Sequence, residues 1–173
     1  FDRNGWRIAV LSYNCVGPEA GWAAPDRAGC NFLRMEAGDG RPVAPNSLLV
    51  APAVEALERL RADIAATRAS ADLVIVALHK GIVHTPAKLA PYERPLAEAA
   101  LVAGADVVVG HHAHILRGVE LRDGRPLFHG LGNGCVVTHA LSPAQDHPAR
   151  AACAKKPGAV HAGDPDTRSG RAR

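Results

Sequence analysis

The sequence has few aromatic side chains, no long hydrophobic run and no closely spaced cysteine pair. Aromatic residues make up 4% of the 173 residues, so a core must be built mainly from Ala, Val and Leu. No window approaches the roughly 18 uninterrupted apolar residues of a membrane span, and we expect no transmembrane segment in this chain. The four cysteines form no C-x-x-C motif, which argues against a zinc ribbon and a thioredoxin-type site. A disulfide between Cys15 and Cys30 is possible in an oxidising compartment, but the sequence cannot decide it, and we expect free thiols by default.

The motifs of several enzyme classes are missing as well. There is no G-x-S-x-G nucleophile elbow, no G-x-G-x-x-G after a strand and no G-K-[ST] phosphate loop. The net charge of +3 arises entirely after Leu141, where six basic residues face three acidic ones. Because the rest of the chain is neutral, we predict no specific nucleic-acid partner. No secretory signal is visible, and the sequence assigns no location or oligomeric state.

The first half of the chain predicts a strand and a helix separated by a long loop. An Asn-Gly turn signal at residues 4–5 precedes an apolar strand over Trp6–Tyr13. Residues 14–46 are rich in Gly, Pro and Asp and predict a surface loop. Apolar residues then recur at helical spacing over residues 51–70, with Pro52 in the first turn of the predicted helix.

The second half predicts a βαβ unit followed by a hairpin. Continuous apolar runs at Asp72–His79 and Asp106–Val109 predict strands buried on both faces, and a helix is expected between them at Tyr92–Ala103. Such strands are parallel. A hairpin turning at Asp123-Gly124 should follow. Together these elements predict an α/β domain over residues 1–141 and a disordered basic tail over residues 142–173.

Histidines end both strands of the βαβ unit, as "IVALH" and "DVVVGHHAH". Carboxyl ends of neighbouring parallel strands meet at one edge of a sheet, where ligands collect. In an extended chain residues two apart point the same way. We therefore expect His112 and His114 to converge with His79, and His111 to face away or toward a different partner. Three imidazoles suit Mn, Fe or Zn, and we predict a divalent transition-metal site at His79, His112 and His114.

Three further residues are candidates for substrate contacts or for neighbours of the metal ligands. They are His84, in the loop after the first strand, His111, and Asn133 in "GLGNG". For His84 a plain surface-loop role is an equal alternative. For Asn133 the alternative is ordinary turn chemistry. The four other histidines are expected to be structural or exposed.

The stretches "ADLVIVALHKG", "AGADVVVGHHAHILRGVEL", "GRPLFHGLGN" and "DRNGWRIAVLSY" together resemble the CapA family, the poly-γ-glutamate capsule-synthesis proteins. That family belongs to the calcineurin-like metallophosphatase superfamily. The resemblance covers roughly residues 4–133 and implies a mixed-sheet sandwich with a two-metal site. Carried over position by position, it also assigns ligand roles to His79, His112 and His114. His111 stands where related nucleotidases carry glycine.

The chain departs from the family pattern at several points. The superfamily's series of D-x-H, G-D and G-N-[HE] motifs, which supplies the bridging carboxylate, is absent from this sequence. The chain has no D-x-H and no G-N-[HE], and its Gly-Asp pairs at residues 38–39 and 163–164 belong to no such series. The family's Trp after "LH" is Lys80 here, and the Phe after "LGN" is Gly134. With histidines alone we expect one metal at most. We therefore expect the chain to be the C-terminal part of a metallophosphatase-like domain.

Two functional hypotheses follow from the resemblance. The first is a metal-dependent phosphoesterase-like protein that acts on a capsule or cell-wall polymer or another phosphoester. The second is a non-catalytic remnant or pseudoenzyme, which binds one metal at most or a partner. Members of the family are often anchored in a membrane outside the cell.

Overall fold

The computed structural model describes residues 1–17, 19–39, 48–85 and 87–133. The chain divides into two units, residues 1–132 and 133–173, and the fold given below is that of the first unit. The predicted domain end at residue 141 and the predicted tail lie outside the described residues.

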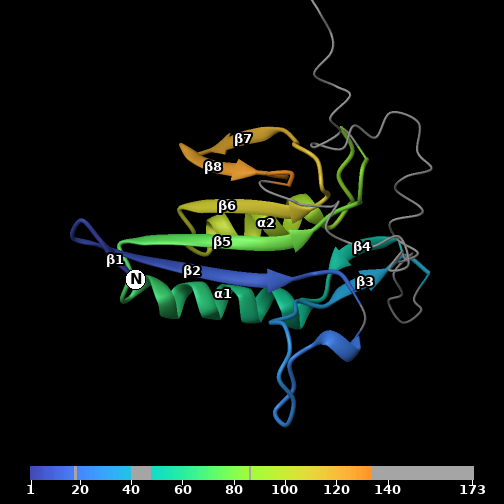
Figure 1. The fold of residues 1–173 in the computed structure, drawn as a ribbon, viewed down its shortest axis with the longest axis horizontal. Coiled ribbons are helices and arrows are strands. Elements are labelled where there is room, and N and C mark those ends of the chain that lie inside the picture. Colours follow the sequence, from blue (N-terminus) through green and yellow to red (C-terminus); the bar gives the residue numbers. More distant parts are fainter. Residues whose placement is uncertain (18, 40–47, 86, 134–173) are drawn as a thin grey trace, which may run out of the picture. The chain divides into compact units, whose positions relative to one another are not determined.

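The first unit is built on a mixed sheet of six strands (Figure 1). Its spatial order is β1-β2-β5-β6-β8-β7, with bounds Asp2–Arg3 (β1), Trp6–Asn14 (β2), Leu73–Lys80 (β5), Val107–His112 (β6), Arg125–Phe128 (β8) and Val119–Arg122 (β7). The four inner strands β2, β5, β6 and β8 run parallel, and the outer strands β1 and β7 are antiparallel to their neighbours. The fold is therefore α/β, as the sequence predicts.

Both hairpin turns lie where the turn residues predict them. Asn4 and Gly5, between β1 and β2, have φ values of 51° and 82°. Asp123 and Gly124, between β7 and β8, have φ values of 51° and 75°. Two-residue hairpin loops of this kind need a left-handed backbone at both positions, which Asn, Asp and Gly accept most readily.

Two helices cover one face of the sheet. They are α1 (Val54–Arg68) and α2 (Glu93–Val102), and β5-α2-β6 forms the predicted βαβ unit. Buried apolar side chains of both helices share one core with alternate residues of β5 and β6: Leu60, Ile64, Leu96, Ala97, Ala100, Leu101, Val74, Val76, Leu78 and Val108. Among the described residues, no helix is both long enough and apolar enough to cross a membrane.

The opposite face of the sheet is only half-buried. Along β5 fully buried residues alternate with half-buried ones such as Ile75, Ala77 and His79. The prediction that this strand is buried on both faces is therefore wrong. A continuous apolar run shows which residues tolerate burial, but the helices α1 and α2 pack against one side only.

Residues 14–46 hold more structure than the predicted loop. The described part contains a short 3₁₀ helix, η1 (Glu19–Gly21), and strand β3 (Met35–Ala37), which pairs antiparallel with β4 (Leu49–Pro52). Pro52 ends β4 and is not in the first turn of α1, because the helix begins two residues later at Val54. These strands of three and four residues are too short to show a clear alternation in sequence.

Candidate functional site: a histidine cluster at the end of the sheet

The parallel register of β5 and β6 brings His79 and His111 together. His79 lies opposite His111, and Lys80 lies opposite His112. Register partners project to the same face of a sheet, and the Nδ1 atoms of His79 and His111 lie 2.8 Å apart. The expectation that His111 faces away from His79 is wrong, because the pairing between strands, rather than alternation along one strand, decides which rings meet.

A left-handed backbone then bends the chain after β6. His112 has φ 92° and His114 has φ 56°, values that residues other than glycine rarely adopt. The alternation of an extended strand ends at this point, and the ring of His112 approaches that of His79 with centroids 4.5 Å apart. The rings of His112 and His114 have centroids 6.0 Å apart, so the predicted pair is together, although by a turn and not by strand alternation.

His84 extends this group of rings. Its backbone is also left-handed, with φ 49°, and its N–H donates to the Ala113 carbonyl over 2.9 Å. Its ring stacks beside His114, with centroids 5.7 Å apart. Five imidazoles from the ends of β5 and β6 and the loops that follow them thus form a continuous series, called here the histidine cluster: His79, His84, His111, His112 and His114.

Burial keeps the inner rings of the histidine cluster uncharged. Burial, together with the neighbouring rings of His112, His111 and His114, lowers the pKa of His79 to about 4. Burial likewise lowers the pKa of His112 to about 4, with His114 and His111 adding to the effect. The pKa of His111 falls for the same reason, and the Lys80 charge lowers it further. At neutral pH these rings are therefore neutral imidazoles with a free lone pair each, the form that binds metals.

The imidazole nitrogens of the histidine cluster are donors that transition metals prefer, but their positions in this structure do not form a ligand set. In the described ranges, no group of three or more His, Cys, Asp or Glu is already placed to hold an ion. The 2.8 Å contact between His79 and His111 is a hydrogen bond, in which one nitrogen carries the proton. A shared metal would require these two rings to rotate apart.

A buried ion cluster lies beneath the histidines. Lys80 and Glu93 are fully buried, and the Lys80 Nζ atom donates to Glu93 Oε2 over 2.8 Å. The Arg117 side chain, 3% exposed, donates to both carboxylate oxygens over 3.2 and 3.3 Å. The Ala90 N–H donates to Glu93 Oε1 over 2.7 Å. We call Lys80, Glu93 and Arg117 the buried ion cluster.

Arg117 also fixes the loop that carries His84. Its Nη2 atom donates to the carbonyl oxygens of Ile82 (2.6 Å) and Thr85 (3.1 Å). Arg117 itself follows His114 by three residues, so one guanidinium joins the two histidine-bearing loops. Beside it, the Gly81 N–H donates to the Tyr92 hydroxyl over 2.7 Å. The rings therefore stand on a base with many hydrogen bonds. The Nε atom of Arg117 is a buried donor without a partner among the described residues.

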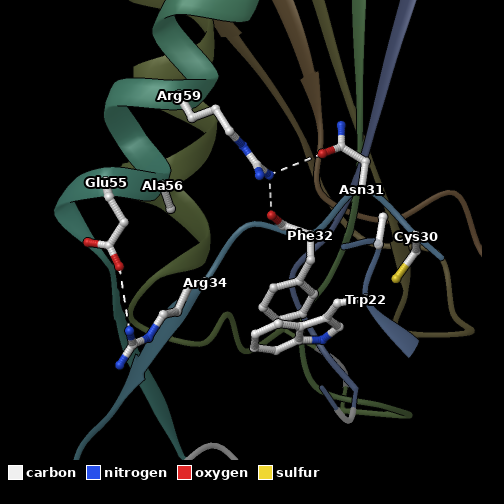
Figure 2. Close-up of a pocket in the computed structure, with 9 residues that line it drawn as sticks. Trp22, Cys30, Asn31, Phe32, Arg34, Glu55, Ala56 and Arg59 are labelled. Carbon is white, nitrogen blue, oxygen red and sulfur yellow. Dashed lines mark hydrogen bonds and ion pairs between the residues drawn. The ribbon is translucent and has the colours of Figure 1, made fainter. Parts of the chain in front are cut away.

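Two adjoining pockets open beside His79. The nearer one, about 390 Å³, is lined by Ser12, Tyr13, Asn14, Cys30, Asn31 and His79. The second, about 370 Å³, shares Cys30 and Asn31 and continues to α1 (Figure 2). Figure 2 shows Trp22 stacked on Phe32, and Arg59 pointing toward Asn31 and Phe32. The two ring centroids lie 3.6 Å apart, and Arg59 donates to Asn31 Oδ1 over 3.0 Å and to the Phe32 carbonyl. Cys15 and Cys30 are both free thiols.

Sequence reasoning missed four residues at this site. Asn14 ends β2 and lies opposite His79 in register. Lys80 had a signal, because it is a charge at a buried position of an apolar strand. Glu93 and Arg117 had none, since each looks like an ordinary surface charge until the fold pairs them. Asn133 belongs to the second unit, and its predicted role stays a prediction.

The comparisons with known proteins agree on one family. Residues 1–136 match the family model described as bacterial capsule synthesis protein PGA_cap. The capsule biosynthesis protein CapA of Bacillus anthracis is 39% identical over 66 residues, which are 38% of this chain and 16% of that protein. The PGA biosynthesis protein CapA of Bacillus subtilis (strain 168) is 39% identical over 70 residues, or 40% of this chain and 18% of that protein.

A third relative, the uncharacterized protein y4sH of Sinorhizobium fredii, is 50% identical over 44 residues, 25% of this chain and 10% of its own length. Each match thus spans less than a fifth of the relative's length. The family model, in contrast, covers most of the present chain, including the strands β5 and β6 that carry His79, His111 and His112. The chain therefore belongs to the PGA_cap family of bacterial capsule synthesis proteins.

Proposed function

We propose that this protein acts in the synthesis of a capsule or cell-wall polymer and that its histidine cluster binds a divalent transition metal. The names of the two Bacillus relatives, a capsule biosynthesis protein and a PGA biosynthesis protein, support the first part. The grouping of five imidazoles at the carboxyl ends of two parallel strands supports the second. This grouping is the observation that carries the proposal, since titratable groups with shifted pKa values concentrate at functional sites.

His79, His112 and His114 would hold the ion, and Mn, Fe or Zn suits imidazole donors. A bound metal of this kind supplies Lewis acidity toward a phosphoester oxygen. The protein contributes neutral rings at pH 7 and a rigid base through Arg117. His84 and His111 flank the three ligands and would contact substrate or orient the ligand rings. Each ring nitrogen of a histidine can donate or accept one hydrogen bond.

Metal analysis of the purified protein tests this proposal. After treatment with a chelator, the protein is dialysed separately against Zn²⁺, Mn²⁺ and Fe²⁺, and bound metal is measured by elemental analysis. We expect about one ion per chain for the wild type, the number that a three-histidine site holds. The variant His112→Ala/His114→Ala should lose this ion. Equal metal content in the two proteins would refute the metal assignment.

A matched control removes two histidines elsewhere. The variant His147→Ala/His161→Ala loses the same number of imidazoles outside the cluster and should keep the metal. Loss of metal in the control to the same extent as in the cluster variant would also count against the proposal. Circular dichroism spectra of all three proteins establish that the fold is retained.

The non-catalytic alternative is favoured by one observation. Among the described residues no carboxylate joins the histidines in a ligand group, whereas a two-metal phosphoesterase needs a bridging carboxylate to hold its ions about 3.5–4 Å apart. We therefore expect this chain to show no Mn²⁺-dependent hydrolysis of bis(p-nitrophenyl) phosphate. Turnover that requires Mn²⁺ and disappears in His112→Ala/His114→Ala would favour the enzyme instead.

A further inference from the structure

The buried ion cluster is not electrically balanced. Lys80 and Arg117 are two cations, and Glu93 is the one carboxylate among the described residues that pairs with either of them. All three side chains are at least 97% buried, because their exposed fractions are 0%, 3% and 0%. One unit of positive charge is therefore left inside the protein, where water screens it little. Such a charge is costly unless an anion compensates it.

This excess charge is adjacent to the histidine cluster, with Lys80 on the helix-covered face of β5 and His79 on the opposite face. Lys80 follows His79 in β5 and stands opposite His112 in β6. Arg117 holds the carbonyl groups on both sides of His84 through Ile82 and Thr85. Both cations thus support the rings from below, and the uncompensated charge attracts a negative group placed among or beside the rings.

The pocket beside His79 offers space for such a group. Its volume is about 390 Å³, and its lining contains no Asp or Glu: Ser12, Tyr13, Asn14, Cys30, Asn31 and His79. The Ser12 hydroxyl, the two Asn amides and the His79 Nε2 atom can donate hydrogen bonds to oxygen atoms. The Tyr13 hydroxyl already donates to Asp63 over 2.9 Å. A pocket without carboxylates, next to a buried excess of positive charge, is suited to an anion with several oxygen acceptors.

We propose that the pocket beside His79 is an oxyanion site, for a phosphate or carboxylate group, and that the unbalanced charge of Lys80 and Arg117 sets its affinity. The site would hold the anionic group of a substrate without any metal. The inference goes beyond the proposed metal binding and does not depend on it. It assigns Lys80 and Arg117 an electrostatic role that a purely structural ion pair would not have.

Charge substitutions within the buried ion cluster test the proposal. The protein is freed of metal with a chelator and titrated with inorganic phosphate, and separately with acetate, while NMR follows the histidine ring signals. In Lys80→Met the net charge of the buried ion cluster falls from +1 to zero. Glu93 keeps Arg117 and the Ala90 N–H as hydrogen-bond donors, so we expect the fold to be retained. Phosphate or acetate should then bind about tenfold more weakly, as expected for one unit charge about 10 Å away at an effective dielectric constant of about 20.

In the double variant Lys80→Met/Glu93→Gln the buried ion cluster again carries one net positive charge, from Arg117, and its affinity for the anion should return to that of the wild type. Arg61→Met removes one exposed charge on α1 and should leave it unchanged. A preference for phosphate indicates a phosphoester group and a preference for acetate indicates a carboxylate, and either supports the site. Equal affinities of wild type and Lys80→Met overturn the proposal, as does the absence of ring shifts with both anions in the wild type. Because no metal is present, neither result depends on the metal proposal.

Discussion

His79 and His111 share a hydrogen bond between their Nδ1 atoms, 2.8 Å apart, across the ends of two parallel strands. One ring donates this bond and the other accepts it, so at least one of the two must be neutral. If both rings were protonated, two N–H groups would face each other. The contact therefore opposes protonation of both rings at once, and burial and the neighbouring charges disfavour the charged form of either ring.

The first prediction is that the protein loses stability as the pH falls from 6.5 to about 4. His79 and His112 take up protons at about pH 6.5 when unfolded but only near pH 4 when folded. In this window the unfolded chain binds more protons, so the free energy of unfolding falls with falling pH. Urea unfolding at several pH values measures the slope. The variant His79→Asn/His112→Asn should show a shallower slope, and an unchanged slope would contradict the assignment.

A second prediction separates buried from exposed arginines. Arg117→Met should lower the free energy of unfolding by about 3 kcal/mol or more, because it leaves a buried carboxylate with one cation and two loop carbonyls without a donor. Arg122 is 42% exposed and forms ion pairs with Glu98 and Glu120. Arg122→Met should therefore lower it by less than about 1 kcal/mol. Denaturant titration of both variants measures the free energy of unfolding. Equal losses in the two variants would show that Arg117 does not stabilise the loops.

The third prediction concerns glycine at position 81. Gly81 has φ 111°, and an added Cβ would lie 3.0 Å from Glu93 Oε2 and 3.2 Å from Arg117 Nη1. Gly5 also has a left-handed backbone, with φ 82°, but an added Cβ there meets nothing within 4 Å. Gly5→Ala should cost about 1–2 kcal/mol of stability from backbone strain alone. Gly81→Ala should cost more, and thermal unfolding of the two variants tests this order.

Thiol reactivity provides the fourth prediction. Cys15 is fully buried, and burial raises the pKa of its thiol to about 12, whereas Cys30 is partly exposed. Since the thiolate is the reactive form, iodoacetamide at pH 8 should label Cys30 and leave Cys15 unmodified until denaturant is added. The variant Cys135→Ser/Cys153→Ser leaves only these two thiols to report. Mass spectrometry of the peptides gives the result, and equal labelling rates would contradict it.

Much of the fold can be predicted from local patterns. The Asn4-Gly5 and Asp123-Gly124 turns, the helix before β5 and the βαβ unit each have a signal within a few residues. The short pair β3 and β4 has none, because three or four residues cannot show a period. The sequence also does not predict which face of β5 is covered, since this depends on where α1 and α2 pack.

The site shows the same division between local and distant information. The histidines can be found from sequence because they follow apolar strands. Their mutual arrangement cannot, because it depends on the register between β5 and β6 and on the left-handed backbone at His112. The buried ion cluster joins residues 13 and 24 positions apart in sequence. Such pairings exist only after the chain has folded, so no spacing rule predicts them.

Three members of the histidine cluster, His84, His112 and His114, occupy backbone conformations that favour glycine. Replacing any of them by glycine would relieve the strain of a left-handed conformation while removing the imidazole. At these positions the fold and the site therefore make opposite demands on the amino acid. Selection of variants for stability alone would therefore favour glycine at these three positions, and the histidine cluster would be lost.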